Sequence, residues 1–379
     1  MFNMKLVVIS SAPLVIQENE KFLYAPYEKE MQLWAKYAHK IQLCCPVWKE
    51  DKGLLVAEVT FPMKPVIVLK EFDVLTLKSA FLAVPTVVYN IITLYKTMQQ
   101  ADHIHLRCPG NMGLLAAIVQ IAFPKKKKTA KYAGNWDPKA KQPFSYKVQR
   151  WLLSNTLLTK NMQVLVYGEW PKQTQNIKPF FTATYSENEI LNTPTSPQKP
   201  AFKEGIKFLF VGTLSQGKQP LYAMQLVEKL LTLGHQVALD FYGEGVLRSE
   251  LETYIAAHLL ADSITLKGNQ SKETLKEAYQ NSHFLILPSK SEGWPKAVAE
   301  AMFWGCVPVA TAVSCVPYML DYGNRGVLLH EHLEKDTTIL LDLLNDSKAY
   351  ELKSKAAQNW SQHYTIELFE AEIKKLLAE

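Results

Sequence analysis

The sequence has few of the features that define several large protein classes. Its 379 residues contain five cysteines without any C-x-x-C spacing, and no D-x-D motif occurs. Scattered cysteines in an odd number favour reduced thiols in the cytoplasm over a disulfide framework. Without D-x-D there is no sign of a metal–diphosphate site of that kind, and we expect no metal. No internal repeat or low-complexity tract is evident.

The sequence also lacks a convincing membrane span or leader. Residues 80–95 carry no charge, but this run is shorter than the roughly 20 apolar residues that a span needs, and it contains Pro85 and Asn90. We predict a buried helix there. The start, MFNMKLVVISSAP, has neither a long apolar core nor a small-residue cleavage site. We interpret it as a strand followed by a loop.

The charge is unevenly distributed. Residues 1–200 hold 25 Lys and Arg against 14 Asp and Glu, whereas residues 201–379 hold 17 against 22. A basic first half suits an anionic partner such as a membrane surface or a phosphorylated lipid. Nucleic acid is the rival partner, but no helix-turn-helix, zinc or aromatic RNA-binding signature accompanies the charge.

Two segments of the basic half are natural candidates for membrane contact. Lys125 to Lys128 form a basic loop, which we interpret as a solvated turn before a strand rather than as a lipid contact. Phe144 to Leu158 mixes aromatic, basic and apolar residues at helical spacing. That pattern is more often core than membrane anchor.

Strands alternate with helices in both halves, which predicts an α/β protein of two doubly wound, Rossmann-like domains facing across a cleft. Residues 193–200 (TPTSPQKP) have the composition of a linker. We therefore expect a first domain over 1–192 and a second over 201–362. The last helix, within 363–379, is expected to return to the first domain.

The most informative stretch is Ser289 to Pro308, SKSEGWPKAVAEAMFWGCVP. An apolar strand precedes it, and Pro295 favours a helix start. Glu292 then lies on a strand-to-helix loop, and Glu300 lies about one and a half turns into the helix. The free N–H groups of such a helix start form an anion site. A bare E-x7-E, however, more often describes two surface glutamates.

This stretch resembles the donor-site signature of the family 4 (group 1) retaining glycosyltransferases, which have the GT-B fold. The resemblance is clear over residues 205–330 and weaker elsewhere. It implies that Glu300 accepts hydrogen bonds from the ribose of a nucleotide-sugar, and that Glu292 acts on the sugar in catalysis. The matching residues are Ser289, Glu292, Gly293, Trp294, Pro295, Glu300, Ala301, Met302, Gly305 and Pro308 to Thr311.

Two further segments resemble donor-side motifs of the family. Gly212 to Lys218 resembles its G-R-L-x-x-x-K diphosphate loop, with Thr213 in place of the arginine. The resemblance implies that Lys218 and the helix start from Trp294 to Lys296 stabilise the departing diphosphate. Gln270 follows a predicted strand and corresponds to the position beside the nucleobase.

The acceptor side is less well marked. Asp102 to Leu106 (DHIHL) resembles the family's D-h-h-H-x-H segment, with Arg107 in place of the second histidine. His105 is an acceptor-side candidate, and a core histidine is the alternative. A later loop offers Asn135 and Asp137, where family members place an active-site histidine that this chain lacks.

The resemblance implies a retaining glycosyltransferase that moves a sugar from a nucleotide-sugar, with a UDP-sugar as the favoured donor and no other cofactor. The expected acceptor is a glycan or a lipid-linked glycan of cell-surface polysaccharide synthesis. The expected location is the cytoplasm, at the inner face of the membrane. Two alternatives stay open: a GT-B-like sugar-nucleotide epimerase and a non-catalytic sugar-nucleotide-binding subunit.

Overall fold

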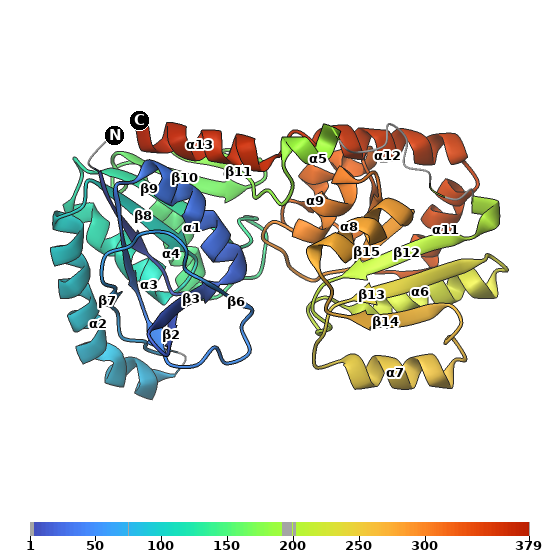
Figure 1. Ribbon diagram of the computed structural model, residues 1–379, viewed down its shortest axis with the longest axis horizontal. Helices are drawn as coiled ribbons and strands as arrows, with labels where there is room; N and C mark the ends of the chain where they lie inside the picture. The colour runs from blue at the N-terminus through green and yellow to red at the C-terminus, as the bar shows by residue number, and fades with distance from the viewer. Residues whose placement is uncertain (1–3, 75, 192–198, 200–201, 379) are drawn as a thin grey trace. The chain divides into compact units, whose positions relative to one another are not determined.

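In the computed structural model the chain forms two compact units (Figure 1). The first runs to Phe180 and takes in the chain again from Glu370, and the second comprises Phe181–Phe369. The structure describes residues 4–74, 76–191, 199 and 202–378. Apart from Lys199, the predicted linker at 193–200 lies outside the described residues.

The boundaries between the units differ from those expected at 192 and 362. The strand Ile177–Phe180 is the last that pairs in the first sheet. Tyr185 already packs against Phe303 and Trp304 of the second unit, with ring centroids 4.8 and 5.0 Å apart. At the other end, Phe369 packs against Phe181, with ring centroids 5.6 Å apart. Aromatic packing thus draws both boundary segments into the second unit.

The first unit is built on a parallel sheet of seven strands in the order β11-β10-β9-β8-β1-β4-β7. The central strand β1 is apolar and almost wholly buried, as expected for a parallel strand covered on both faces. The strands are β1 (Lys5–Ile9), β4 (Lys40–Cys45), β7 (Ile67–Val68), β8 (His103–Cys108), β9 (Lys127–Tyr132), β10 (Met162–Tyr167) and β11 (Ile177–Phe180).

The first unit also contains a second, small sheet, which the sequence analysis did not predict. Its order is β5-β2-β3-β6, with strands β2 (Leu14–Gln17), β3 (Glu20–Tyr24), β5 (Val47–Trp48) and β6 (Val56–Glu58). Glu18 and Asn19, at the turn of its hairpin, both have positive φ. Such a turn matches the twist of the paired strands.

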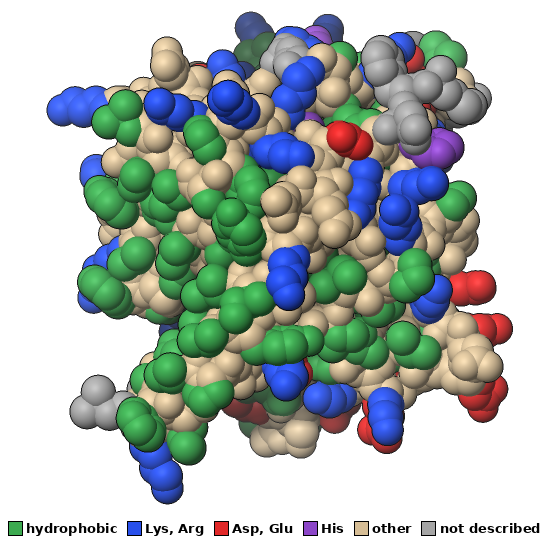
Figure 2. All heavy atoms as spheres, turned by 90° about the vertical axis from the view of Figure 1, so that its left-hand side faces the viewer, with side chains coloured by type: hydrophobic (Ala, Val, Ile, Leu, Met, Phe, Trp, Pro, Cys, Tyr) green, Lys and Arg blue, Asp and Glu red, His purple; other side chains and the backbone are tan. Residues whose placement is uncertain are grey.

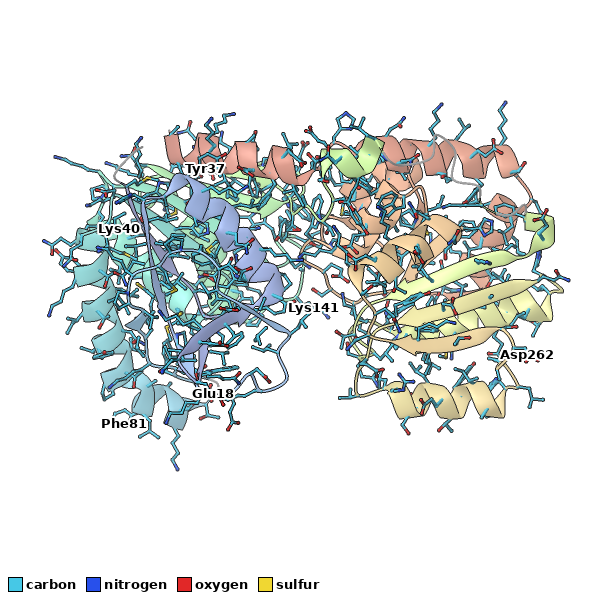
Figure 3. The ribbon with its side chains drawn as sticks, in the orientation of Figure 1. Glu18, Tyr37, Lys40, Phe81, Lys141 and Asp262 are labelled. Atoms are coloured by element: carbon cyan, nitrogen blue, oxygen red, sulfur yellow. The ribbon has the colours of Figure 1, made fainter. Side chains whose placement is uncertain are left out.

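Helices cover both faces of the seven-stranded sheet (Figure 1). One buried apolar cluster joins α2, α3 and α4 to the sheet. The helices of the unit are α1 (Ala25–Tyr37), α2 (Leu77–Gln99), α3 (Asn111–Val119), η1 (Gln120–Ala122), α4 (Phe144–Ser154) and the end of α13 (Ile366–Ala378). In this last part of α13, Glu370 accepts a hydrogen bond of 2.8 Å from Tyr37, the last residue of α1, which Figure 3 labels.

The helix predicted to be buried at 80–95 is α2, and that prediction is wrong for one of its faces. Ala83, Asn90 and Leu94 face the core, but Phe81 is 78% exposed and Leu82 is 65% exposed. Figure 3 shows Phe81 pointing away from the sheet. By length and composition, residues 78–99 pass as a membrane span. Periodicity does not reveal burial here, because both faces of the helix are apolar.

The second unit contains a parallel sheet of six strands in the order β14-β13-β12-β15-β16-β17. In chain order this is 3-2-1-4-5-6, the order of dinucleotide-binding doubly wound domains, whose ligands bind where the order reverses. The strands are β12 (Ile206–Val211), β13 (Val237–Tyr242), β14 (Ile264–Gly268), β15 (Phe284–Leu287), β16 (Val307–Thr311) and β17 (Val327–Leu329).

The helices of the second unit follow its strands in alternation, as the sequence predicted. They are α5 (Glu187–Leu191), η2 (Phe202–Glu204), α6 (Pro220–Thr232), α7 (Arg248–Ala257), α8 (Lys272–Asn281), α9 (Lys296–Phe303), α10 (Val316–Met319), η3 (Asp321–Gly323), α11 (Leu333–Leu344), α12 (Ser347–Ser361) and the start of α13. Because β12 lies beside β15, the loops after these two strands are neighbours.

Candidate donor site

The loops that follow β12 and β15 are joined to one another by hydrogen bonds. The backbone N–H of Lys290 donates to the carbonyl of Gly217 over 2.8 Å. The side-chain amide of Gln219 donates to the carbonyl of Pro288 over 2.6 Å. These bonds fix the two loops at the point where the strand order reverses, which is the expected ligand position in this fold.

Lys218 and Glu292 meet in this pair of loops. The Lys218 Nζ lies 2.5 Å from the Glu292 Oε1, and their side chains are 28% and 8% exposed. The sequence analysis assigned both residues to catalysis but did not predict that they pair. The lysine remains accessible from solvent, so an incoming anion can compete with the carboxylate for it.

The start of α9 follows Glu292 directly. Its N-cap is Pro295, and within the described part of the chain no side chain caps it. The loop before it is held in place, because the Ser314 hydroxyl and the Cys315 thiol donate to the carbonyl of Gly293 over 3.2 and 3.1 Å. Trp294 stacks on Trp360 at a centroid distance of 6.2 Å. A helix start that is held in place in this way, without a side-chain cap, is the kind of position at which proteins bind anions.

Two glycines explain why the loops after β12 and β13 approach so closely. A Cβ at Gly243 would lie 2.0 Å from the carbonyl oxygen of Gly212, and one at Gly245 would lie 2.3 Å from that of Leu214. Two backbone hydrogen bonds hold the loops together: the amide of Gly212 donates to the carbonyl of Tyr242 over 2.9 Å, and the amide of Leu214 donates to that of Glu244 over 3.0 Å. The G-x-G at 243–245 therefore shapes the loop that presents Lys218.

Glu300 lies on α9 with both carboxylate oxygens already bonded. Thr184 donates to its Oε1 over 2.8 Å, and Tyr279 donates to its Oε2 over 3.1 Å. Burial raises the pKa of Glu300. Burial also raises the pKa of Tyr279 well above its ordinary value. A carboxylate has about four acceptor sites, so these two bonds leave acceptor capacity on Glu300.

Gln270 and Thr213 are exposed, each on a loop that follows a strand. The Gln270 amide donates to the carbonyl of Lys267 over 2.7 Å, after the positive-φ residue Gly268. The Thr213 carbonyl accepts from the amide of Ser215 over 2.9 Å. Both side chains are therefore accessible on the edge of the sheet that carries Lys218.

The acceptor-side candidate Arg107 forms an ion pair and a ring contact within the first unit. Its Nη1 lies 2.9 Å from the Glu30 Oε2, and the Lys131 Nζ lies 3.0 Å from the same oxygen. The guanidinium also lies over the ring of Tyr27, 4.0 Å from its centroid. Burial acts to raise the pKa of Glu30, but Lys131 and Arg107 outweigh it and hold that pKa below its ordinary value.

His105 has the placement of a core histidine, the alternative left open by the sequence. It is fully buried, its Nδ1 lies 2.8 Å from the Thr129 hydroxyl, and its ring packs against Trp34 at 4.3 Å. Burial lowers its pKa to about 3. Asn135 and Asp137 organise their own loop, accepting from the amides of Asp137 and Lys139 over 2.9 and 2.8 Å.

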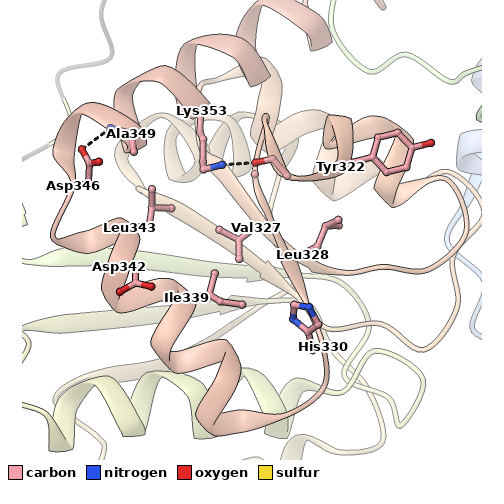
Figure 4. A pocket seen from close by; sticks show the side chains of 12 residues that line it. Tyr322, Val327, Leu328, His330, Ile339, Asp342, Leu343, Asp346, Ala349 and Lys353 are labelled. Carbon is pink, nitrogen blue, oxygen red and sulfur yellow. Dashed lines mark hydrogen bonds between the residues drawn. The ribbon is translucent and has the colours of Figure 1, made fainter.

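One surface pocket of the second unit lies away from these residues, between β17, α11 and α12 (Figure 4). Its polar groups have structural roles: Asp346 accepts from the amide of Ala349 over 2.9 Å, and Lys353 donates to the carbonyl of Gly323. None of the predicted site residues lines it. Across the described residues, no cluster of three or more His, Cys, Asp or Glu side chains forms a metal site.

Residues 192–360 match the family model of the glycosyl transferases group 1. The match covers less than half of the chain and shows a similarity to that family. The chain is 25% identical over 151 residues to the alpha-D-kanosaminyltransferase of Streptomyces kanamyceticus, covering 40% of this chain and 39% of that protein. It is 27% identical over 139 residues to the amylovoran biosynthesis glycosyltransferase AmsK of Erwinia amylovora, covering 35% and 34%. The chain thus spans well under half the length of either relative.

A solved structure extends the similarity to the whole chain. HepE of Anabaena, crystallised in complex with UDP, matches 99% of both chains with a TM-score of 0.69 at 14% identity. At that identity the likeness shows the fold, which is GT-B, as the sequence predicted. The residues that match the family model lie within the second unit and include the Lys218–Glu292 pair.

Proposed function

We propose that the protein is a retaining glycosyltransferase that moves a sugar from a UDP-sugar to a glycan or lipid-linked glycan in cell-surface polysaccharide synthesis. The observation that carries the proposal is the Lys218–Glu292 pair, next to the start of α9 in the part of the chain that matches the family model. UDP in the crystal of HepE supports the choice of base. The similarity to AmsK supports a polysaccharide acceptor.

The pair offers a simple sequence of charge movements. Before the donor binds, Lys218 and Glu292 neutralise one another. A nucleoside diphosphate brings negative charge to the α9 start and draws Lys218 toward its phosphates. Glu292 is then left facing the sugar, whose transition state carries positive charge, as in glycoside cleavage. Lys218 and the helix amides meanwhile stabilise the charge that grows on the departing diphosphate.

The experiment that tests the proposal is incubation of the purified protein with a panel of UDP-sugars, with release of UDP and change of the sugar followed separately. We expect slow hydrolysis in the absence of an acceptor, with UDP released. Isomerised UDP-sugar without release would establish the epimerase alternative. Binding of the UDP-sugar, seen as a raised melting temperature, with no turnover even with glycan acceptors, would establish the non-catalytic alternative.

A further inference from the structure

The outer surface of α2 is unusually apolar for a helix at the surface of a protein. Six of its side chains are between 47 and 78% exposed: Phe81, Leu82, Val84, Val88, Ile92 and Tyr95. We call this set the α2 face. Ile118 and Ile121, at the end of α3 and in η1, add exposed apolar area at 46 and 37%. The Tyr95 ring packs on Phe123 at 5.0 Å, which joins the two parts.

The chain around this face is mostly basic. Residues 70–168 hold fourteen Lys and Arg and four acids, and α2 itself carries Lys78 and Lys96 without any acid. Glu71 and Asp73 are exposed just before α2, whereas Asp102 accepts from the amide of Lys5 and Asp137 from that of Lys139, each over 2.8 Å. Figure 2 looks onto this side of the first unit: apolar side chains gather across it, with Lys and Arg between them and acidic side chains mostly toward its rim.

We propose that the α2 face docks on an anionic lipid surface, with the helix lying in the plane of the interface. A helix with an exposed apolar strip, lysines at its ends and no acid of its own has the pattern of helices that bury their apolar side at the boundary between headgroups and acyl chains. Lys78 and Lys96 are exposed at the two ends of the strip, and Lys70 lies over the ring of Tyr89, 4.5 Å from its centroid. These cations reach the headgroups while the apolar side chains reach below them.

The opposite side of α2 keeps the helix from spanning the bilayer. Asn90 is fully buried and pairs with the backbone of Lys70, accepting over 2.9 Å and donating over 2.8 Å. Ala83, Leu94 and Met98 are buried in the core of the unit. Spanning would break these contacts, whereas lying flat keeps them.

A second copy of the chain is a poorer occupant for this face. A two-fold contact places the same patch of both copies together, so the lysines of one α2 would meet those of the other, and α2 itself offers no acid to pair with them. An anionic lipid surface neutralises these charges instead.

The basic loop at 125–128 is not the centre of this surface. Lys126 donates to the carbonyls of Gln99 and Ala101 and so caps the end of α2. Lys128 is buried, donates to the carbonyl of Phe123 over 2.8 Å, and has its pKa lowered to about 8 by that burial. The segment is a turn before β9, as the sequence predicted, with Lys125 and Lys127 exposed. Lys127 donates to the carbonyl of Ala378, so Lys125 is the lysine of this turn that we expect to add to the α2 face.

The proposal does not depend on the glycosyltransferase activity, so its test uses binding alone. The intact protein is sedimented with vesicles of phosphatidylcholine, with and without phosphatidylglycerol, at low and high salt. We expect binding to the anionic vesicles that weakens with salt. Replacing Val88 and Ile92 by Ser should lower the partition coefficient about tenfold or more, because this buried apolar area is lost.

The matched control is Val246→Ser with Leu352→Ser, two exposed apolar residues of the second unit, which should bind as the wild type does. A second variant, Lys78→Glu with Lys96→Glu, removes the attraction without touching the apolar strip and should also lower binding. The changed residues are exposed, so melting temperatures should stay within a few degrees. The proposal is overturned by absence of binding to anionic vesicles at low salt, or by binding indifferent to both α2 variants. A dimer that the Ser variant dissociates without vesicles would overturn it too, by assigning the face to self-association.

Discussion

Each unit of the molecule has one charged cluster near the carboxyl ends of its central strands, and the two clusters differ in access. In the second unit, Lys218 and Glu292 lie on loops, and the lysine is 28% exposed. In the first, Glu30 on α1 holds Arg107 and Lys131, which project from neighbouring positions of β8 and β9. There Lys131 is 2% exposed. The same types of charge at the same kind of strand end are open to solvent in one unit and enclosed in the other.

The difference teaches that a strand end does not by itself make a binding site. Lys218 and Glu292 follow their strands in glycine-containing loops, beyond the ends of β12 and β15. Arg107 lies one residue before the end of β8, and Glu30 of α1 pairs with it there. A charge so enclosed must be neutralised by the protein, because leaving it unpaired costs several kcal/mol.

The largest effect is expected from breaking the cluster of Glu30, Arg107 and Lys131, which we call the closed cluster. Replacing Glu30 by Ala leaves Arg107 and Lys131 buried without their carboxylate, and should lower the free energy of unfolding of the first unit by about 3–5 kcal/mol. Urea unfolding measures the loss. The exposed Glu20, changed to Ala, is the control and should change stability by less than about 0.5 kcal/mol. A loss that small for Glu30→Ala would mean that the cluster is solvated.

A substitution in the pair Lys218 and Glu292, which we call the open cluster, should instead affect turnover. Lys218→Ala is expected to lower kcat about tenfold to a thousandfold, by removing a preorganised charge from the leaving diphosphate. Steady-state release of UDP measures this, and calorimetry should show UDP binding weakened more than uridine binding. Lys229→Ala, an exposed lysine on α6, is the control. Equal losses for UDP and uridine would contradict contact between Lys218 and phosphate.

The two buried histidines of β8, His103 and His105, predict acid sensitivity of the first unit. Burial lowers the pKa of His103 to about 4 and of His105 to about 3. Each binds a proton more readily unfolded, so stability falls as pH drops below the unfolded pKa of about 6.5, by roughly 2 kcal/mol per histidine at pH 5. Urea unfolding at pH 7 and pH 5 measures the slope. His105→Gln should make the slope shallower, and an unchanged slope would exclude His105 as its source.

The smallest effect concerns Glu300, which resembles the closed cluster in burial and the open one in position. Its raised pKa means that its charge costs stability above the unfolded pKa, so Glu300→Gln should leave the melting temperature at pH 7 unchanged or raised. The same change should weaken UDP about tenfold, because an amide replaces a charged acceptor for the ribose hydroxyls. Glu351→Gln, at an exposed position of α12, is the control. Unaltered UDP affinity by calorimetry would remove the ribose assignment.

Much of the second unit was predictable from sequence because its signals are local. The apolar run before Ser289, the turn at Gly293 to Pro295 and the helix from Lys296 each depend on neighbouring residues. The pairing of Lys218 with Glu292 was not predictable from spacing, since 74 positions separate them. Their meeting follows from β12 lying beside β15, a property of the sheet.

The first unit shows where sequence reasoning fails. Nothing near His105 or Arg107 in the chain indicates that α1 lies over them, because the residues that bury them, Trp34 and Glu30, come from a distant segment. The exposed face of α2 was missed for the same reason, since apolar residues occur on all its sides. Only the neighbours in space decide which side is covered.

The sequence by itself determined the alternation of strands and helices, the donor-side loops and the uneven charge, because each depends on residue type and short-range order. The tertiary structure alone decided which charges are accessible, which glutamate is already bonded, and which apolar face is left to the solvent. Accessibility is set by whatever packs from elsewhere in the chain. In this protein a single helix, α1, makes one charged cluster structural, while the lack of a covering element on α2 leaves an apolar helix exposed.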